Sequence, residues 1–310
     1  MTEVTGGMPK NGTILVGTAT VPGASGSSPD SAVIFRENVG LRGIFITGTD
    51  TGVGKTHLTC LIARQLLACG VRVAAYKPVC SGAIARPRPP SSSESTAYYQ
   101  WEDIERLRTA TGGEWPDDVI CPQRFLEPLA PPIAARLEGR TVDDRLLVEG
   151  ARRFPGAELL LIEGAGGWLS PLTESTTVAD LARELNVPVL IVARAGLGTI
   201  NHTLLTIESI RSRGLIVAGV VLNEVIPVGD DTSYMTNGGE IEARSGVLVF
   251  GTIPHGNDFD LHREGRSDVA EAASLPARHG NALELHREGR PVTIDWQRFA
   301  QPMNRGRAKA

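Results

Sequence analysis

A glycine-rich segment, GTDTGVGKT at residues 48–56, constrains the fold of this chain more than any other feature. It follows a short apolar run at 43–47 and precedes a helix-length segment, the context of a phosphate-binding loop. Glycines let successive backbone N–H groups point inward, and the N-terminus of the following helix adds about half a positive charge. Lys55 is placed to neutralise the β- and γ-phosphates, and Thr56 to ligate Mg²⁺. Five residues separate Gly48 from Gly54, where the usual loop has four. The segment predicts nucleotide binding.

Short apolar runs alternate with helix-length segments from Gly43 onward, and several of these runs are apolar on both faces. Such runs belong to a parallel sheet that helices cover on both sides. The alternation predicts an α/β protein with a mostly parallel sheet flanked by helices, of the P-loop NTPase kind. The predicted strands are 43–47, 71–76, 158–163, 188–193, 215–222 and 247–252, and the predicted helices are 55–69, 103–111, 178–185 and 200–213.

The composition excludes several classes of protein. The 310 residues carry a formal charge of −4 and a pI near 5.9, which gives no electrostatic reason to bind nucleic acid or an anionic membrane. No run reaches the ~18 apolar residues of a membrane span, and no secretory signal pattern is visible at the N-terminus. The four cysteines form no CxxC pair, as is typical of reduced thiols. We therefore expect a cytoplasmic protein.

The chain divides into three parts on composition. Residues 1–41 are rich in Gly, Ser, Thr and Pro and are expected to be a flexible extension, with an added strand near 13–17 as the less favoured alternative. Residues 42–300 form the predicted nucleotide-binding domain, and 301–310 a flexible tail.

Two further segments interrupt the alternation of strands and helices. The prolines and serines of residues 86–96 predict a surface loop. The sequence LHREGR occurs at 261–266 and again at 285–290, which we interpret as coincidence or a local duplication in a solvated tail, because one recurrence does not make a solenoid.

Charged residues at predicted strand ends supply candidate catalytic groups. Glu163 ends an apolar strand beside the phosphate-binding loop and is a candidate metal ligand. Asp103, at the start of a helix, and Asp50, inside the loop, are further candidates that spacing alone does not rank. Lys77 follows the second strand, where it can face the nucleotide or a second substrate.

Several motifs together resemble the dethiobiotin synthetase family. They are GTDTGVGKT, YKPVCSG at 76–82, EGAGGW at 163–168, LGTINH at 197–202 and LNEV at 222–225. The segment CPQRFLEPLAPPIAA at 121–135 is similar to that family's proline-containing segment, and IDWQRF at 294–299 is also family-like. The resemblance covers roughly residues 43–256.

The resemblance implies a reaction in which ATP, CO₂ and 7,8-diaminononanoate give dethiobiotin, ADP and phosphate. It implies a homodimer with Lys77 and Lys55 as catalytic residues, and Mg²⁺ bound by Thr56, Asp103 and Glu163. The ATP-binding residues that it implies are Gly52, Val53, Gly54, Lys55, Thr56, His57, Glu163, Gly164, Ala165, Gly166, Asn223, Pro254, His255 and Gly256. The substrate-binding residues that it implies are Thr51, Ser81, Gly198, Thr199, Ile200 and Asn201, and the last four would hold the substrate carboxylate across the dimer interface.

Two other functions compete with this one. An ATP-dependent amide-forming ligase of the cobyrinate amidase type shares a similar loop, but this chain has no cysteine in a nucleophile elbow. A MinD-like ATPase switch usually carries a lysine early in the loop, where Asp50 and its neighbours stand here. A guanine-specific G-domain is disfavoured because the sequence contains no NKxD motif.

Overall fold

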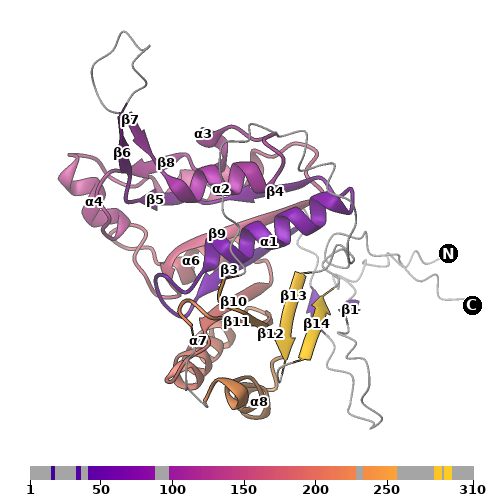
Figure 1. Ribbon diagram of the computed structural model, residues 1–310. Coiled ribbons are helices and arrows are strands. Elements are labelled where there is room, and N and C mark those ends of the chain that lie inside the picture. Colours follow the sequence, from indigo (N-terminus) through magenta and orange to yellow (C-terminus); the bar gives the residue numbers. More distant parts are fainter. Residues whose placement is uncertain are drawn as a thin grey trace, which may run out of the picture.

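The strand that leads into the glycine-rich loop lies inside an eight-stranded sheet (Figure 1). The structure is a computed structural model that describes residues 15–17, 33–35, 41–87, 98–227, 233–256, 283–287 and 290–294. The strand order is β14-β13-β12-β11-β10-β3-β9-β4. The strands are β3 (Gly43–Gly48), β4 (Val73–Tyr76), β9 (Leu159–Gly167), β10 (Val189–Arg194), β11 (Val217–Asn223), β12 (Val249–Ile253), β13 (Leu283–Arg287) and β14 (Arg290–Ile294).

The six strands from β12 to β4 pair in parallel, and β13 and β14 extend the sheet in antiparallel pairing. The central strands are buried on both faces: Ile44, Phe45 and Ile46 of β3 are each at most 1% exposed. The prediction of a mostly parallel sheet is therefore confirmed.

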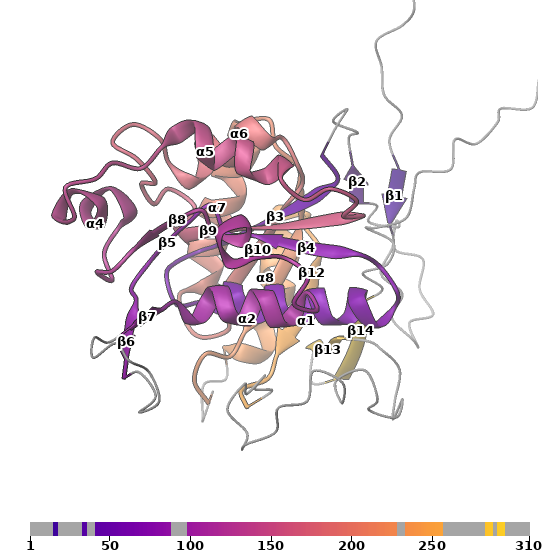
Figure 2. The same cartoon turned by 90° about the horizontal axis from the view of Figure 1, so that it is seen from above.

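Helices cover both faces of this sheet (Figure 2). On one face lie α1 (Lys55–Ala68) and α2 (Glu102–Ala110), and on the other α5 (Asp144–Glu149) and α6 (Val178–Leu185). Of two more helices, α7 (Thr199–Ser212) packs against β10 and β11, and α8 (Tyr234–Ser245) packs against α7 and β12. The layers bury the sheet on both sides, as its continuous apolar runs require.

All six predicted strands and all four predicted helices are present, with ends that differ by a few residues. The largest difference is at β9, which continues through glycines to Gly167, where the sequence predicted an end at Glu163. The extension is explained by pairing, because Gly167 lies opposite Gly48 in β3.

Several elements were not predicted. They include the two-stranded sheets β5 (Val79–Ser81) with β8 (Gln123–Phe125) and β6 (Ile84–Arg86) with β7 (Tyr98–Gln100), the helices α3 (Asp117–Ile120), α4 (Pro131–Leu137), α5 and α8, and the 3₁₀ turn η1 (Gly150–Arg152). Most are too short to show periodicity. Helix α8 is longer, but Gly238 and Gly239 at its middle have low helix propensity.

The two ends of the chain also contain strands. In the N-terminal segment, β1 (Leu15–Gly17) pairs antiparallel with β2 (Val33–Phe35), and β1 falls in the range of the less favoured alternative. The second LHREGR copy overlaps β13 and β14, which pair with each other and, through β13, with β12 of the main sheet. The first copy, the tail 301–310, the tip of the proline-rich loop (88–97) and most of IDWQRF lie outside the described residues. No described helix is long and apolar enough to cross a membrane.

Candidate active site

The phosphate-binding loop joins β3 to α1 at the carboxyl edge of the sheet. Gly54 precedes the helix with φ 95° and ψ 28°, a left-handed conformation that disfavours other residues. No side chain among the described residues caps this helix start, and a helix N-terminus favours an anion. Lys55 Nζ folds back to donate to the Asp50 carbonyl oxygen at 3.2 Å. The loop therefore has the conformation of a phosphate cradle.

Asn223, predicted to contact the base, lies at the end of β11 and is buried. Its Nδ2 donates to the Val53 carbonyl oxygen at 3.0 Å, which ties β11 to the loop. A Cβ atom at Gly54 would lie 2.1 Å from this nitrogen. Gly54 is therefore required both by its backbone conformation and by the close approach of Asn223.

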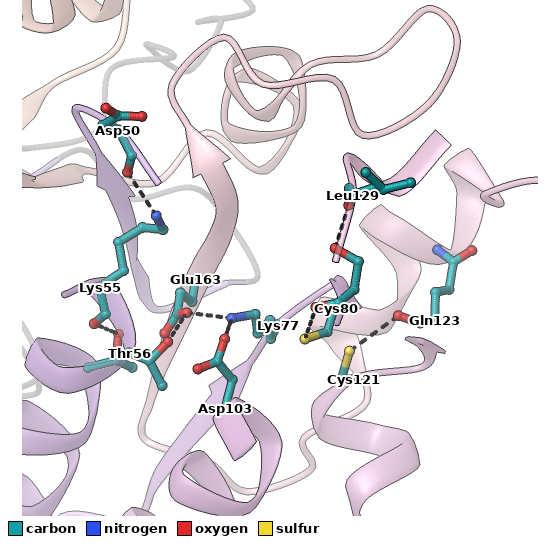
Figure 3. A network of polar contacts seen from close by, with 12 residues as sticks. Asp50, Lys55, Thr56, Lys77, Cys80, Asp103, Cys121, Gln123, Leu129 and Glu163 are labelled. Atoms are coloured by element: carbon teal, nitrogen blue, oxygen red, sulfur yellow. Dashed lines mark hydrogen bonds and ion pairs between the residues drawn. The ribbon is translucent and has the colours of Figure 1, made fainter. Parts of the chain in front are cut away.

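Four side chains that were singled out in the sequence meet next to the loop (Figure 3). Lys77 Nζ donates to Glu163 Oε1 at 2.9 Å and also to Asp103 Oδ2. Thr56 Oγ1 donates to the same Glu163 oxygen at 2.6 Å. These groups come from α1, the end of β4, α2 and β9, so the contacts link residues up to 107 positions apart. We refer to Thr56, Lys77, Asp103 and Glu163 as the carboxylate–lysine cluster.

Charges in this cluster determine the protonation of its members. Burial would lower the pKa of Lys77, but Glu163 and Asp103 outweigh it and hold that pKa well above its usual value. Burial would likewise raise the pKa of Asp103, but the Lys77 ammonium and its hydrogen bond hold it below its usual value. Lys55 differs, because burial dominates over the attraction of Glu163 and lowers its pKa to about 8. The two carboxylates therefore favour the protonated, cationic form of Lys77.

The cluster fits a magnesium ion that is bound together with a nucleotide. Glu163 Oε2 is buried and has no hydrogen-bond partner in the described part of the chain. Two carboxylates and a hydroxyl are hard oxygen donors of the kind Mg²⁺ takes, usually with phosphate oxygens and water completing its shell. Among the described residues, no group of three or more His, Cys, Asp or Glu side chains could hold a metal ion.

The glycines after Glu163 allow the chain to approach its neighbours closely. A Cβ atom at Gly164 would lie 2.8 Å from Val178 Cγ1, and one at Gly166 would lie 2.4 Å from Ser170 Oγ. Gly166 also has φ 77°, and the Ser170 hydroxyl accepts from the Gly167 N–H at 2.8 Å. This turn lies against the loop, since Gly167 pairs with Gly48.

The predicted substrate residues lie in three places. Thr51 is exposed on the loop, and its N–H donates to Asp50 Oδ1. Ser81 ends β5, and its hydroxyl donates to the Leu129 carbonyl oxygen at 2.6 Å. Residues 198–201 begin α7, which no described side chain caps, and Gly198 there has φ 90°. Thr199 is buried, while Gly198 and Asn201 are exposed.

A cavity of about 470 Å³ adjoins the loop. Its walls are residues 50–53 of the loop, 194–197 from the last residue of β10 onward and 223–227 from the last residue of β11 onward. Of these, 51–53 and Asn223 were predicted as site residues, and Asp50 was an unranked candidate metal ligand. The motif LNEV contains Glu224, but no role was assigned to it. Pro254, His255 and Gly256, which were predicted to line the base, follow β12 and do not line this cavity. His57, on the first turn of α1, is half-buried.

Comparisons with known proteins agree with this geometry. A family model described as an AAA domain matches residues 42–263. The chain is 45% identical over 220 residues to the ATP-dependent dethiobiotin synthetase BioD of Anaeromyxobacter sp. (strain Fw109-5), covering 71% of this chain and 92% of the relative. It is 49% identical over 228 residues to the protein of the same name from Anaeromyxobacter dehalogenans (strain 2CP-1), covering 73% and 95%. Against dethiobiotin synthetase BioD 1 of Escherichia coli O157:H7 the identity is 38% over 194 residues, covering 62% and 82%.

Proposed function

The chain belongs to the family of ATP-dependent dethiobiotin synthetases, and from this we propose that it closes 7,8-diaminononanoate with CO₂ to dethiobiotin, at the expense of ATP. The observation that carries the proposal is the carboxylate–lysine cluster beside the phosphate-binding loop. It brings a buried cation and two carboxylates to the position where a terminal phosphoryl group would lie. The family favours this function over an ATPase switch or another amide-forming ligase.

The reaction has three bond-forming steps. One substrate amine adds to CO₂, loses a proton and becomes a carbamate. A carbamate oxygen attacks the γ-phosphorus, and ADP leaves. The second amine then attacks the carbamoyl carbon of the mixed anhydride, loses a proton and expels phosphate, which leaves a cyclic urea.

The cations of the site lower the cost of making the first nucleophile. An alkylamine with a pKa of about 10.4 is neutral at pH 7 in only about one molecule in 2,500, and deprotonation costs about 4.6 kcal/mol. Lys77, which stays protonated, and Lys55 disfavour an ammonium ion nearby. The same two charges stabilise the carbamate anion and the transferring phosphoryl oxygens. Positioning and charge suffice, without a covalent enzyme intermediate.

We propose that Thr56, Asp103 and Glu163 hold Mg²⁺ with the nucleotide, where the ion would neutralise developing phosphate charge. The unpartnered Glu163 Oε2 supports this assignment. The loop from Gly52 to Thr56, with His57 and Gly164–Gly166, would surround the phosphates. Asn223 and Pro254–Gly256 would adjoin the base.

The diamine would bind at Thr51 and Ser81, with its carboxylate at the start of α7 (Gly198, Thr199, Ile200 and Asn201). An uncapped helix N-terminus suits a carboxylate. Because residues 198–201 would serve the partner's site, we propose a homodimer. We also propose that the enzyme is cytoplasmic and that its catalytic unit is residues 42–300. Native mass measurement tests the dimer.

Phosphate release from ATP tests the proposal, with diaminononanoate and bicarbonate each omitted in turn. Release that needs both, together with a cyclic urea product identified by mass spectrometry, is the expected result. Hydrolysis that proceeds without the diamine would contradict the synthetase assignment and point to an ATPase switch.

A further inference from the structure

The first turn of α2 carries Asp103, one of the proposed ligands of Mg²⁺. Its carboxylate points at the Lys77 ammonium and is hydrogen-bonded to it (Figure 3). No side chain in the described part of the chain caps this helix, and its first turn holds three acidic residues, Glu102, Asp103 and Glu105. Contacts other than a cap therefore hold this turn in place.

Trp101, the residue just before α2, makes such contacts. Its indole Nε1 donates to the carbonyl oxygen of Phe125, the last residue of β8, at 3.0 Å. The Arg124 guanidinium lies 5.4 Å from the centroid of the indole ring, within range of a cation–π interaction. The Trp101 carbonyl oxygen accepts from the N–H groups of Ile104 and Glu105 at 3.1 and 3.2 Å. The indole ring, which packs against the hydrophobic core, therefore ties the start of the helix to β8.

Strand β8 is also connected to the segment that carries Lys77. It pairs in parallel with β5, which begins at Val79, two positions after Lys77. The Lys77 N–H donates to the Ile120 carbonyl oxygen at 2.8 Å, three residues before β8 begins. Asp103 thus has two attachments to the same part of the structure. One is its own ion pair with Lys77, and the other runs through Trp101 and β8.

The second attachment matters most when the metal is bound. Mg²⁺ held by Asp103 and Glu163 would repel the Lys77 ammonium, because both are cations. The ion pair between Lys77 and Asp103 then contributes less, and the position of Asp103 depends on the start of α2. Mg²⁺ demands near-ideal octahedral geometry, and residues that orient a metal ligand typically contribute about 10- to 100-fold to metal affinity.

We propose that Trp101 is a positioning residue of the metal site, which holds Asp103 in place for Mg²⁺ by anchoring the start of α2 to β8. The inference rests on the proposed function, which makes Asp103 a ligand of Mg²⁺. It adds to the carboxylate–lysine cluster a residue outside it. Trp101 acts through Asp103 and not on the substrates.

Binding of ADP in the presence of Mg²⁺ or of EDTA, without diamine, tests the proposal. The ratio of the two dissociation constants isolates the contribution of the metal, and calorimetry measures both. We expect Mg²⁺ to tighten the binding of ADP to the native protein. Trp101→Phe keeps an aromatic ring for Arg124 but loses the indole N–H, and should reduce the ratio by about tenfold. The constant in EDTA should stay unchanged, because the phosphate-binding loop is not altered.

Trp115→Phe is the matched control, because Trp115 makes the same two kinds of contact away from the cluster. Its Nε1 donates to the Val73 carbonyl oxygen at 3.1 Å, and the Arg72 guanidinium lies 5.2 Å from its ring centroid. Val73 begins β4, at the end of the strand opposite to the one that precedes Lys77. Trp115→Phe should therefore destabilise the fold without changing the ratio. Thermal melting of both variants verifies folding and compares their stabilities.

Each outcome decides the proposal. A lower ratio in Trp101→Phe alone supports it. An unchanged ratio in Trp101→Phe, or an equal loss in Trp115→Phe, would overturn it, because Trp101 would then serve only general stability. If Mg²⁺ did not tighten ADP binding by the native protein, Asp103 would not be a metal ligand and the inference would fall with that assignment. The proposed function fails separately, if diamine and bicarbonate together do not elicit phosphate release.

Discussion

The Lys77 ammonium donates to Glu163 Oε1 at 2.9 Å, across 86 positions of sequence. Glu163 is fully buried and Lys77 is 5% exposed, so this ion pair is largely removed from water. A buried charge is costly unless it is paired. The contact therefore fixes the carboxyl ends of β4 and β9 relative to each other, and it keeps a positive charge beside the phosphate-binding loop.

Lys77→Gln should lose most turnover while nucleotide binding survives. The amide keeps much of the side chain's shape but removes the cation that favours the neutral amine and the transferring phosphoryl group. We expect kcat to fall at least 100-fold, with the dissociation constant of ATP within about fivefold of its native value. Equal losses of ATP affinity and turnover would remove Lys77 from the catalytic role.

Lys77→Met should destabilise the protein in a way that Mg²⁺ partly reverses. Removing the lysine leaves Glu163 and Asp103 without their counter-ion, which we expect to cost about 3 kcal/mol of unfolding free energy. A divalent cation bound by the same carboxylates together with nucleotide phosphates would restore part of this. Urea denaturation in the presence of ADP, with and without Mg²⁺, measures the effect. Arg244→Met, which breaks the exposed pair with Glu240, is the matched control and should cost about 0.5 kcal/mol regardless of Mg²⁺.

Gly54→Ala should strongly weaken nucleotide binding, while the protein still folds. The new methyl group would meet Asn223, and φ 95° is unfavourable for alanine by about 1–3 kcal/mol. The loop must then shift, and we expect ATP affinity to fall at least tenfold by calorimetry. Gly113→Ala is the control: its φ is also positive (76°), but the space around it is open. If both variants bound ATP like the native protein, the loop would tolerate the shift.

Buried thiols should make the protein less stable above pH 9. Burial raises the pKa of Cys80 from 9.0 to about 11. Between these two values the unfolded chain loses the thiol proton and the folded protein keeps it. The unfolding free energy therefore falls by ~1.4 kcal/mol per pH unit for this thiol.

In Cys80→Ala, the unfolding free energy should fall less steeply with pH above 9, by the contribution of about one proton. Cys69→Ala, at a partly exposed cysteine, should leave this pH dependence unchanged. Chemical denaturation of both variants at several pH values from 8 to 11 gives these slopes. Identical slopes in the native protein and Cys80→Ala would show that the Cys80 thiol ionises without unfolding.

The central part of this fold was predictable because its signals are local and strong. The strands were visible as short runs of apolar residues, and Gly54-Lys55-Thr56 indicated the start of α1. Glu163 and Lys77 were identified as strand-end residues, and the sheet brings them together because parallel strands end on one edge. Asp103 needed the family resemblance, since its spacing did not distinguish it from Asp50.

The elements that were not predicted depend on contacts between residues that are distant in sequence. Strand β5 exists because Val79 pairs with Gln123, and three residues alone show no pattern. Trp101 was passed over because its significance lies in its bond to Phe125, which belongs to another element. The direct bond of Asn223 to Val53 also had no signal in the sequence.

The position of β3 inside the sheet has a consequence for synthesis of the chain. This strand leaves the ribosome well before either of its partners, because β9 begins at Leu159 and β10 at Val189. More than a hundred further residues must be synthesised before both edges of β3 can pair and its apolar side chains can be buried. Pairing of strands that are so distant in sequence slows folding and prolongs the exposure of apolar surface. The nascent chain should therefore depend on chaperones most strongly before β10 emerges.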